Sequence, residues 1–267
     1  MEQNSLWAAL CMTTLAGLST GLGGLLVLWF RPSGRLLGRS LGFAAGVMLA
    51  VSLSDLVPGG LETLEQALPP AQAGAAAGSL LLAGMLLAGA MERLLPDEAG
   101  LLAAMPDTGG GGEAARARAL RCGLVVGLAL LLHNLPEGVL TLFSGIRDPR
   151  AGLRLSLAIA LHNLPEGIST AAPLWSATHS PWTSAGAAFA SGLAEPVGAL
   201  LAYFVLRPVL SAGLLACLTL AAAGMMCWVS VAELLFGGFA LERKADTALG
   251  FAAGVCGMTL GIAILAG

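Results

Sequence analysis

The sequence predicts an all-α integral membrane protein with eight transmembrane helices. Hydrophobic residues make up 57% of the 267-residue chain, charged residues make up only 11%, and the mean hydropathy is +0.84. A soluble domain carries about 25% charged residues, which its wetted surface needs. The apolar residues also fall in long runs rather than in a narrow periodic stripe, and this favours membrane-spanning helices over a large soluble core.

Eight apolar runs are long enough to cross a hydrocarbon core, which takes about 20 helical residues. The first run follows Met1-Glu2-Gln3 without basic residues, so we do not interpret it as a signal peptide. Together the runs form one transmembrane domain over residues 1–267. We expect the spans at about 5–30, 37–57, 74–95, 120–145, 152–174, 183–206, 212–236 and 247–266.

The connecting segments predict an orientation in the cell (inner) membrane. The longest one, at about 96–119, contains four consecutive glycines and is typical of a flexible cytoplasmic loop. Basic residues favour the cytoplasmic side. With eight spans, this places both termini outside the cytoplasm. One set of loops holds Arg31, Arg35, Arg39, Arg93, Arg116, Arg118, Arg121, Arg243 and Lys244, and the other holds Arg147, Arg150, Arg154 and Arg207.

The Arg147–Arg154 cluster contradicts this orientation, since it lies on the side expected to be poor in basic residues.

The net charge of the chain excludes one class of partner. A net charge of −3 excludes nucleic acid as a partner on electrostatic grounds, because nucleic-acid binding depends on neutralising phosphates with Lys and Arg.

The fourth and fifth spans carry the same hexapeptide. The fourth contains His133-Asn134-Leu135-Pro136-Glu137-Gly138, and the fifth contains His162-Asn163-Leu164-Pro165-Glu166-Gly167. His and Glu four residues apart lie on one helix face, one turn from each other. Each proline removes a backbone donor, so we expect a kink in both helices. Facing helices would then gather the imidazoles and carboxylates at one point.

The sixth span adds a third carboxylate, Glu195, next to Pro196. Carboxylates at membrane depth are costly unless a positive charge balances them. No Lys or Arg falls in the middle of a span, so protons or bound cations must supply that charge. Imidazole and carboxylate together suit Zn2+, Fe2+, Mn2+, Co2+ or Cd2+. Two divalent ions would nearly balance three carboxylates, and the number of ions, one or two, stays open.

The residues alone leave three functions open. The first is transport by alternating access, with ions bound near the midplane. The second is a membrane metalloenzyme in which the metal activates water. The order H-x-x-x-E differs from the H-E-x-x-H of zinc proteases and the E-x-x-H of di-iron bundles, which disfavours an enzyme. The third is a selective metal channel with the same site and no moving element.

The two hexapeptides, followed by Ser191-Gly192-Leu193-Ala194-Glu195-Pro196, resemble the ZIP (Zrt/Irt-like) family of divalent metal transporters, and within it the bacterial ZupT/GufA-like branch. The resemblance covers essentially the whole chain. It implies a metal site between the fourth and fifth spans, movement of the metal into the cytoplasm and a homodimer. It implies Zn2+ or another divalent metal as the transported substrate and no prosthetic group.

The resemblance also implies roles for individual residues. Met48 in the second span is expected to reach the metal centre, Asp55 to lie at the entrance and Glu233 to lie on the exit side. In contrast to many family members, this chain has no His in the loop at 96–119, so metal delivery by that loop is in doubt. The metal ligands that the resemblance assigns are His133, Asn134, Glu137, His162, Asn163, Glu166 and Glu195.

Overall fold

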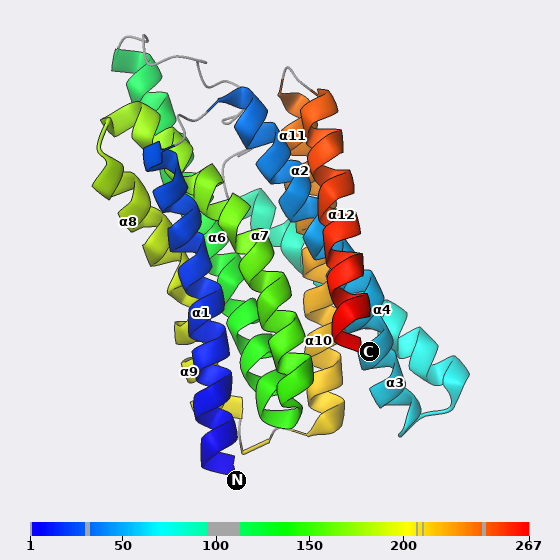
Figure 1. Ribbon diagram of the computed structural model, residues 1–267. Helices are drawn as coiled ribbons and strands as arrows, with labels where there is room; N and C mark the ends of the chain where they lie inside the picture. Colours follow the sequence, from blue (N-terminus) through cyan, green and yellow to red (C-terminus); the bar gives the residue numbers. More distant parts are fainter. Residues whose placement is uncertain are drawn as a thin grey trace.

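The computed structural model describes residues 2–29, 33–94, 113–206, 208–209, 211–241 and 244–266, and it contains no strand within those ranges. Figure 1 shows the helices side by side in one bundle. The helices are α1 (Glu2–Trp29), α2 (Gly34–Val51), η1 (Ser52–Leu56), α3 (Val57–Glu65), α4 (Pro70–Leu94), α6 (Glu113–Arg147), α7 (Pro149–Thr178), α8 (Pro181–Gly192), α9 (Ala194–Leu206), α10 (Ala212–Trp228), η2 (Val229–Leu235), α11 (Phe236–Ala240) and α12 (Lys244–Ala266).

Several helix starts follow from local sequence. Ser33, Asp148, Ser180 and Ser211 each have extended backbone angles and accept a hydrogen bond from an amide two or three residues later. Such side chains satisfy amides of the first turn that have no partner within the helix. Proline follows directly at the first helical position of α7 and α8, where its missing N–H costs nothing.

Six segments in the described ranges are long and apolar enough to cross a membrane: Ser5–Val27, Gly34–Glu65, Pro70–Arg93, Pro181–Leu206, Ala212–Ala240 and Lys244–Ile264. They correspond to six of the eight expected spans. The other two expected spans fall in α6 and α7. Both helices carry the polar hexapeptide, which lowers the hydropathy of the stretch around it. The all-helical membrane class is therefore confirmed, and the count of eight remains a prediction.

Only the last part of the expected loop at 96–119 lies within the described residues. Residues 95–112 lie outside the described residues. Residues 113–119 belong to α6, so this helix begins several residues before the expected start near 120. The segment that follows the four glycines is rich in Ala and Arg, both strong helix formers, which explains the early start.

The helices form two groups. The α1 group consists of α1, α6, α7, α8 and α9, and the α2 group consists of α2, η1, α3, α4, α10, η2, α11 and α12. Each helix packs mainly within its own group, and the principal contact between the groups is α2 against α7. In Figure 1 the α1 group lies on the left and the α2 group on the right.

The repeated segment Leu-Gly-Phe-Ala-Ala-Gly-Val, at 41–47 and 249–255, brings α2 and α12 together. A Cβ at Gly42 would collide with the carbonyl oxygen of Thr247, and one at Gly250 would collide with that of Arg39. The absence of side chains lets the two backbones approach closely, as in small-residue packing of membrane helices. The repeat is therefore a packing device.

Two π-helical turns interrupt the long helices of the α2 group. η1 follows α2 and packs against α10, while η2 follows α10 and packs against α2. A π turn inserts an extra residue into an α-helix, and such turns are frequent at functional sites. Asp55 lies in η1 and Glu233 lies in η2.

The helix break near the hexapeptides falls in the sixth span rather than the fourth or fifth. α6 and α7 continue as α-helix through Pro136 and Pro165, so the expected kinks are not interruptions. The sixth span instead stops at Gly192 and resumes at Ala194. Pro196 offers no amide to the Gly192 carbonyl, and Gly192 is pressed against the backbone of Gly17. Leu193 is left as a turn two residues before Glu195.

Candidate metal centre

Glu137 of α6 links the two hexapeptides. Its Oε1 lies 3.1 Å from His133 Nε2, one turn earlier on the same helix. Its Oε1 and Oε2 lie 3.2 and 3.3 Å from His162 Nε2 on α7. All three side chains are buried, with exposed fractions of 8% or less. The expected contact between His and Glu four residues apart is thus present in α6, and Glu137 also reaches across to the second helix.

The His162 ring has a second contact that fixes its orientation. Its Nδ1 lies 3.2 Å from the carbonyl oxygen of Ala158, one turn earlier on α7. If Nδ1 carries a proton, it donates to that carbonyl and Nε2 is presented to Glu137. An imidazole held in this way has its other nitrogen directed at whatever lies in the centre, which is the usual arrangement of a metal-binding His.

The two Asn side chains use their amide groups to tie the centre to neighbouring helices. Asn134 Nδ2 donates to the carbonyl oxygen of Ser191 in α8, at 3.2 Å. Asn163 Nδ2 donates to the carbonyl oxygen of Ala16 in α1, at 3.0 Å, and to Glu195 Oε1 in α9. Both Oδ1 atoms are buried without a hydrogen-bond partner among the described residues. They are therefore the atoms of these residues that remain open to a cation.

Glu166 and Glu195 are the carboxylates of the centre with the greatest need for a counter-charge. Glu166 is 1% exposed and Glu195 is fully buried. Neither oxygen of Glu166, nor Oε2 of Glu195, has a hydrogen-bond partner in the described part of the chain. Glu166 nevertheless interacts electrostatically with His162, Glu137 and His133. Because a buried carboxylate without a hydrogen-bond partner is costly, a proton or a cation must balance the charge of these atoms.

The described arginines do not supply that charge. Their ion pairs are those of Arg35 and Arg39 with Asp246 and of Arg154 with Asp55. Within the described residues, no group of three or more His, Cys, Asp or Glu side chains is already arranged to hold a metal ion. The imidazoles and Glu137 contact one another instead. The arrangement brings nitrogen and oxygen atoms together with carboxylates whose charge no described Lys or Arg balances.

The last residue of each hexapeptide has a packing role that the sequence did not reveal. A Cβ at Gly138 would collide with the backbone carbonyl of Glu195, and one at Gly167 would collide with that of Thr20. These glycines let α9 and α1 approach the two helices that carry the ligands. The close approach of α9 places the backbone of Glu195 directly against α6.

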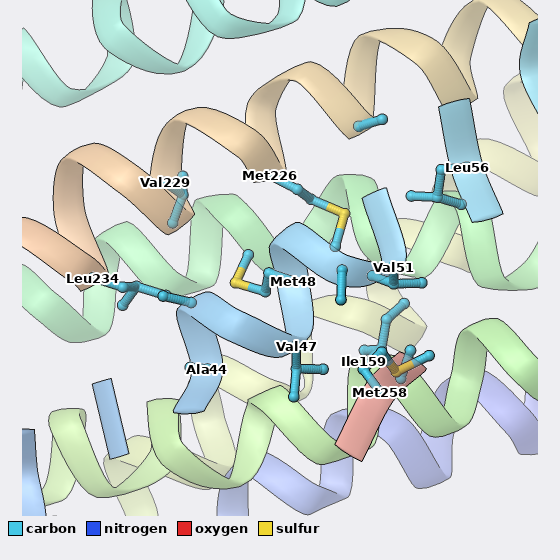
Figure 2. Packing of buried hydrophobic residues seen from close by; sticks show 14 of the residues in the cluster. Ala44, Val47, Met48, Val51, Leu56, Ile159, Met226, Val229, Leu234 and Met258 are labelled. Atoms are coloured by element: carbon cyan, nitrogen blue, oxygen red, sulfur yellow. The ribbon is translucent and has the colours of Figure 1, made fainter. Parts of the chain in front are cut away.

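The three remaining candidates lie in the α2 group. Met48 is fully buried in an apolar cluster with Met226, Val229 and Leu234, as Figure 2 shows. Asp55 Oδ1 lies 3.8 Å from Arg154 Nε of α7. Glu233 interacts electrostatically with His133, so η2 lies close enough to α6 for its carboxylate to affect that imidazole.

Sequence reasoning missed the backbone carbonyls of Ala16 and Ser191, which hold the two Asn side chains. Every residue has a backbone carbonyl, so the residue type does not show which carbonyl holds a neighbouring side chain. It also passed over Thr13 and Thr20 of α1 and Thr170 of α7, whose hydroxyls are buried without a hydrogen-bond partner among the described residues. Hydroxyl residues in otherwise apolar spans were the available signal for these three.

Comparison with known proteins adds independent information. The family model described as ZIP zinc transporter matches residues 103–267. The zinc transporter ZupT of Chlorobium limicola is 42% identical over 231 residues, covering 86% of this chain and 87% of the relative. ZupT of Chlorobium luteolum is 39% identical over 265 residues, covering 97% and 98%, and ZupT of Corynebacterium efficiens is 36% identical over 266 residues, covering 98% of each chain.

Proposed function

The chain belongs to the ZIP family of zinc transporters and is thus an integral membrane transporter of divalent metal ions rather than an enzyme, and on that premise we propose that Zn2+ crosses the membrane through the polar centre of α6 and α7. The proposed ligands are the imidazoles of His133 and His162 and the carboxylates of Glu137 and Glu166. Asn134, Asn163 and Glu195 complete the ligand set. Fe2+, Mn2+, Co2+ and Cd2+ are further substrates that such ligands suit.

One observation carries this proposal: the Glu137 carboxylate lies between two imidazole nitrogens, at 3.1 and 3.2 Å. Zinc binds nitrogen and carboxylate oxygen at about 2.0–2.2 Å with tetrahedral geometry. Two ligands of one tetrahedral ion are therefore about 3.3–3.6 Å apart. The atoms of the centre are already close to that spacing, so small side-chain movements bring them to a shared ion.

Binding of a metal ion would change the partners of the Glu137 and Glu166 carboxylates. In the structure, the imidazoles contact Glu137, whereas neither oxygen of Glu166 has a hydrogen-bond partner among the described residues. A divalent ion that takes the place of the imidazole protons attracts both Glu137 and Glu166, and binding releases protons because metal ligands must be deprotonated. The second carboxylate thus provides the extra negative charge that a divalent ion needs and a proton does not.

The two helix groups provide the moving parts that alternating access requires. The seven proposed ligands lie within the α1 group. The main contact between the α1 group and the α2 group is that of α7 with α2. A rigid shift of one group against the other would open the centre to one side at a time. Asp55 in η1 is the proposed entrance residue and Glu233 in η2 the proposed exit residue, with movement into the cytoplasm.

Initial rates of zinc uptake into proteoliposomes test this mechanism. The rates are measured with an enclosed zinc-sensitive dye over a range of zinc concentrations and at two membrane voltages. A saturable rate with weak dependence on voltage supports alternating access. A rate that does not saturate and follows voltage steeply contradicts it and favours a channel.

A further inference from the structure

Arg154 accounts for one of the three arginines that form the exception in the charge pattern of the loops. It belongs to the Arg147–Arg154 cluster on the side expected to be poor in basic residues. In the structure it lies in the second turn of α7, inside the bundle, with about a quarter of its side chain exposed. Its Nε faces Asp55 of η1. Arg154 is therefore not a free loop charge, and its pairing with Asp55 calls for a reason.

The pair is loose. Arg154 Nε lies 3.8 Å from Asp55 Oδ1, which is beyond hydrogen-bond distance. That nitrogen is buried and has no hydrogen-bond partner in the described part of the chain. A structural Arg–carboxylate pair is usually shorter and bidentate. The Arg154–Asp55 contact is instead an attraction between charges that leaves the carboxylate oxygens available to a closer cation.

We propose that Arg154 is an internal cation that occupies Asp55 until an arriving divalent ion displaces it, so that Arg154 sets the apparent affinity and the divalent selectivity of the entrance. The inference rests on the proposed function in taking Asp55 as the entrance residue. Arg154 is separated from His162 by eight residues, about 12 Å along α7, and so acts at the entrance rather than as a ligand of the centre.

Charge and distance decide which ions can displace it. A divalent ion at about 2.1 Å from a carboxylate oxygen has twice the charge of the guanidinium at little more than half its distance. At equal dielectric constant its attraction to Asp55 is about three to four times stronger. A monovalent ion gains only from the shorter distance, so its advantage over the guanidinium is about half that of a divalent ion. Divalent ions therefore displace Arg154 more readily than sodium does.

The pair also joins the two helix groups, since η1 belongs to the α2 group and Arg154 to the α1 group. Displacement by a metal ion removes one ionic contact between them at the moment of loading. The same event that admits the ion thus removes an ionic contact between η1 and α7, which lie on opposite sides of the boundary that the proposed shift must cross.

The test is zinc uptake by proteoliposomes that contain the native chain, Arg154→Gln or Arg154→Lys, with sodium or choline as the bulk cation at equal ionic strength. We expect Arg154→Gln to lower the KM for zinc about two- to fivefold, the range set by partly exposed ion pairs, with kcat changed less than KM. We also expect sodium to inhibit this variant more than choline does. Arg154→Lys keeps a tethered cation and should behave like the native chain.

A KM for Arg154→Gln that equals or exceeds the native value, without sodium inhibition, overturns the proposal. If Arg154→Gln does not reach the membrane, Arg154→Met, which keeps much of the apolar stem, takes its place with the same expectation. Asp55→Asn separates the two proposals. It should raise the KM and abolish the sodium sensitivity of Arg154→Gln, whereas an unchanged KM would remove Asp55 from the entrance and so contradict that part of the proposed function.

Discussion

The α1 and α2 groups each bury a carboxylate, and they neutralise it in different ways. Asp246 of α12 is 7% exposed, and Arg39 Nε lies 2.8 Å and Arg35 Nε 3.9 Å from its oxygens. Glu166 of α7 is 1% exposed, and neither of its oxygens has a hydrogen-bond partner among the described residues. Asp246 has a permanent counter-charge in the α2 group. Glu166 has no ion pair with a described Lys or Arg, and under the proposed function the transported ion supplies its counter-charge.

The surroundings of the two carboxylates differ in the same direction. The largest apolar cluster is centred on α2 and α10, and it also includes buried residues of α1, α6, α7 and α12 (Figure 2). All seven proposed ligands that the hexapeptides and the sixth span contribute lie in the α1 group. The α2 group supplies most of the apolar cluster and pairs Asp246 internally, and such a group is suited to stay fixed. A group with an incomplete charge balance is suited to bind and carry a cation.

The largest expected effect comes from Glu137→Ala. The change removes the carboxylate that contacts both imidazoles, so we expect zinc uptake to fall more than about 100-fold, since loss of a supporting partner alone costs about 10–100-fold. The amount of protein in the membrane should be unchanged, because a buried carboxylate whose charge is balanced by a transported ion adds little to the stability of the fold. Uptake and abundance are compared with those of Glu65→Ala, an exposed carboxylate on α3. Normal uptake in Glu137→Ala would show that the centre lies elsewhere.

A smaller effect is expected for His162→Gln, which exchanges an imidazole for an amide. Imidazole suits Zn2+, whereas carbonyl oxygen suits Mn2+, so the ratio of kcat/KM for zinc over manganese should fall about tenfold. The thermal midpoint in detergent should change little, because an amide can still donate to Glu137. An unchanged ratio of the two metals would mean that His162 does not select among them.

Gly138→Ala tests the packing that places Glu195. The new Cβ would collide with the Glu195 carbonyl and push α9 away from α6, at a cost of about 1–3 kcal/mol in the free energy of unfolding. Zinc uptake should fall together with stability. Gly186→Ala on α8 is the matched control, since its new methyl group would meet no described atom beyond the neighbouring backbone of its own helix, and it should be neutral or slightly stabilising. Equal stability of the two variants would contradict the close approach of α9.

The smallest effect is expected for Asp246→Ala. Its partners Arg35 and Arg39 are more than half exposed and can be hydrated when the carboxylate is gone. Loss of the pair and of an acidic residue in the first turn of α12 should cost about 1–2 kcal/mol of stability. Zinc KM should stay at the native value. A changed KM with unchanged stability would place Asp246 on the transport path and erase the contrast between the two groups.

Sequence patterns predicted that the polar residues of the hexapeptides and of the sixth span lie close together, because residue type and helical spacing carry that information. The interval of four residues between His133 and Glu137 predicted their contact, and the polar residues at membrane depth predicted a site. The prolines predicted kinks in α6 and α7, and both helices continue through their prolines, whereas an interruption occurs before Glu195 in the sixth span. A proline removes one hydrogen bond, and tertiary packing decides whether the helix then breaks.

Other features depend on three-dimensional contacts that no local pattern records. The π turns that contain Asp55 and Glu233 change the helix by a single residue and have no sequence signature. The role of Gly138 depends on a partner backbone 57 residues away in the chain. The bridging position of Glu137, rather than Glu166, reflects how α6 and α7 are rotated against each other. The pairing of Arg154 with Asp55 likewise joins segments that only the fold brings together.

The central claim is that the transported metal neutralises the unpaired carboxylates of the α1 group. Zinc uptake into dye-loaded proteoliposomes, together with the zinc content of the purified protein, tests it most directly when the native chain is compared with Glu166→Ala. The account predicts saturable uptake and bound zinc in the native chain, and a loss of both in a Glu166→Ala variant that remains folded. Native rates of uptake by Glu166→Ala would contradict it.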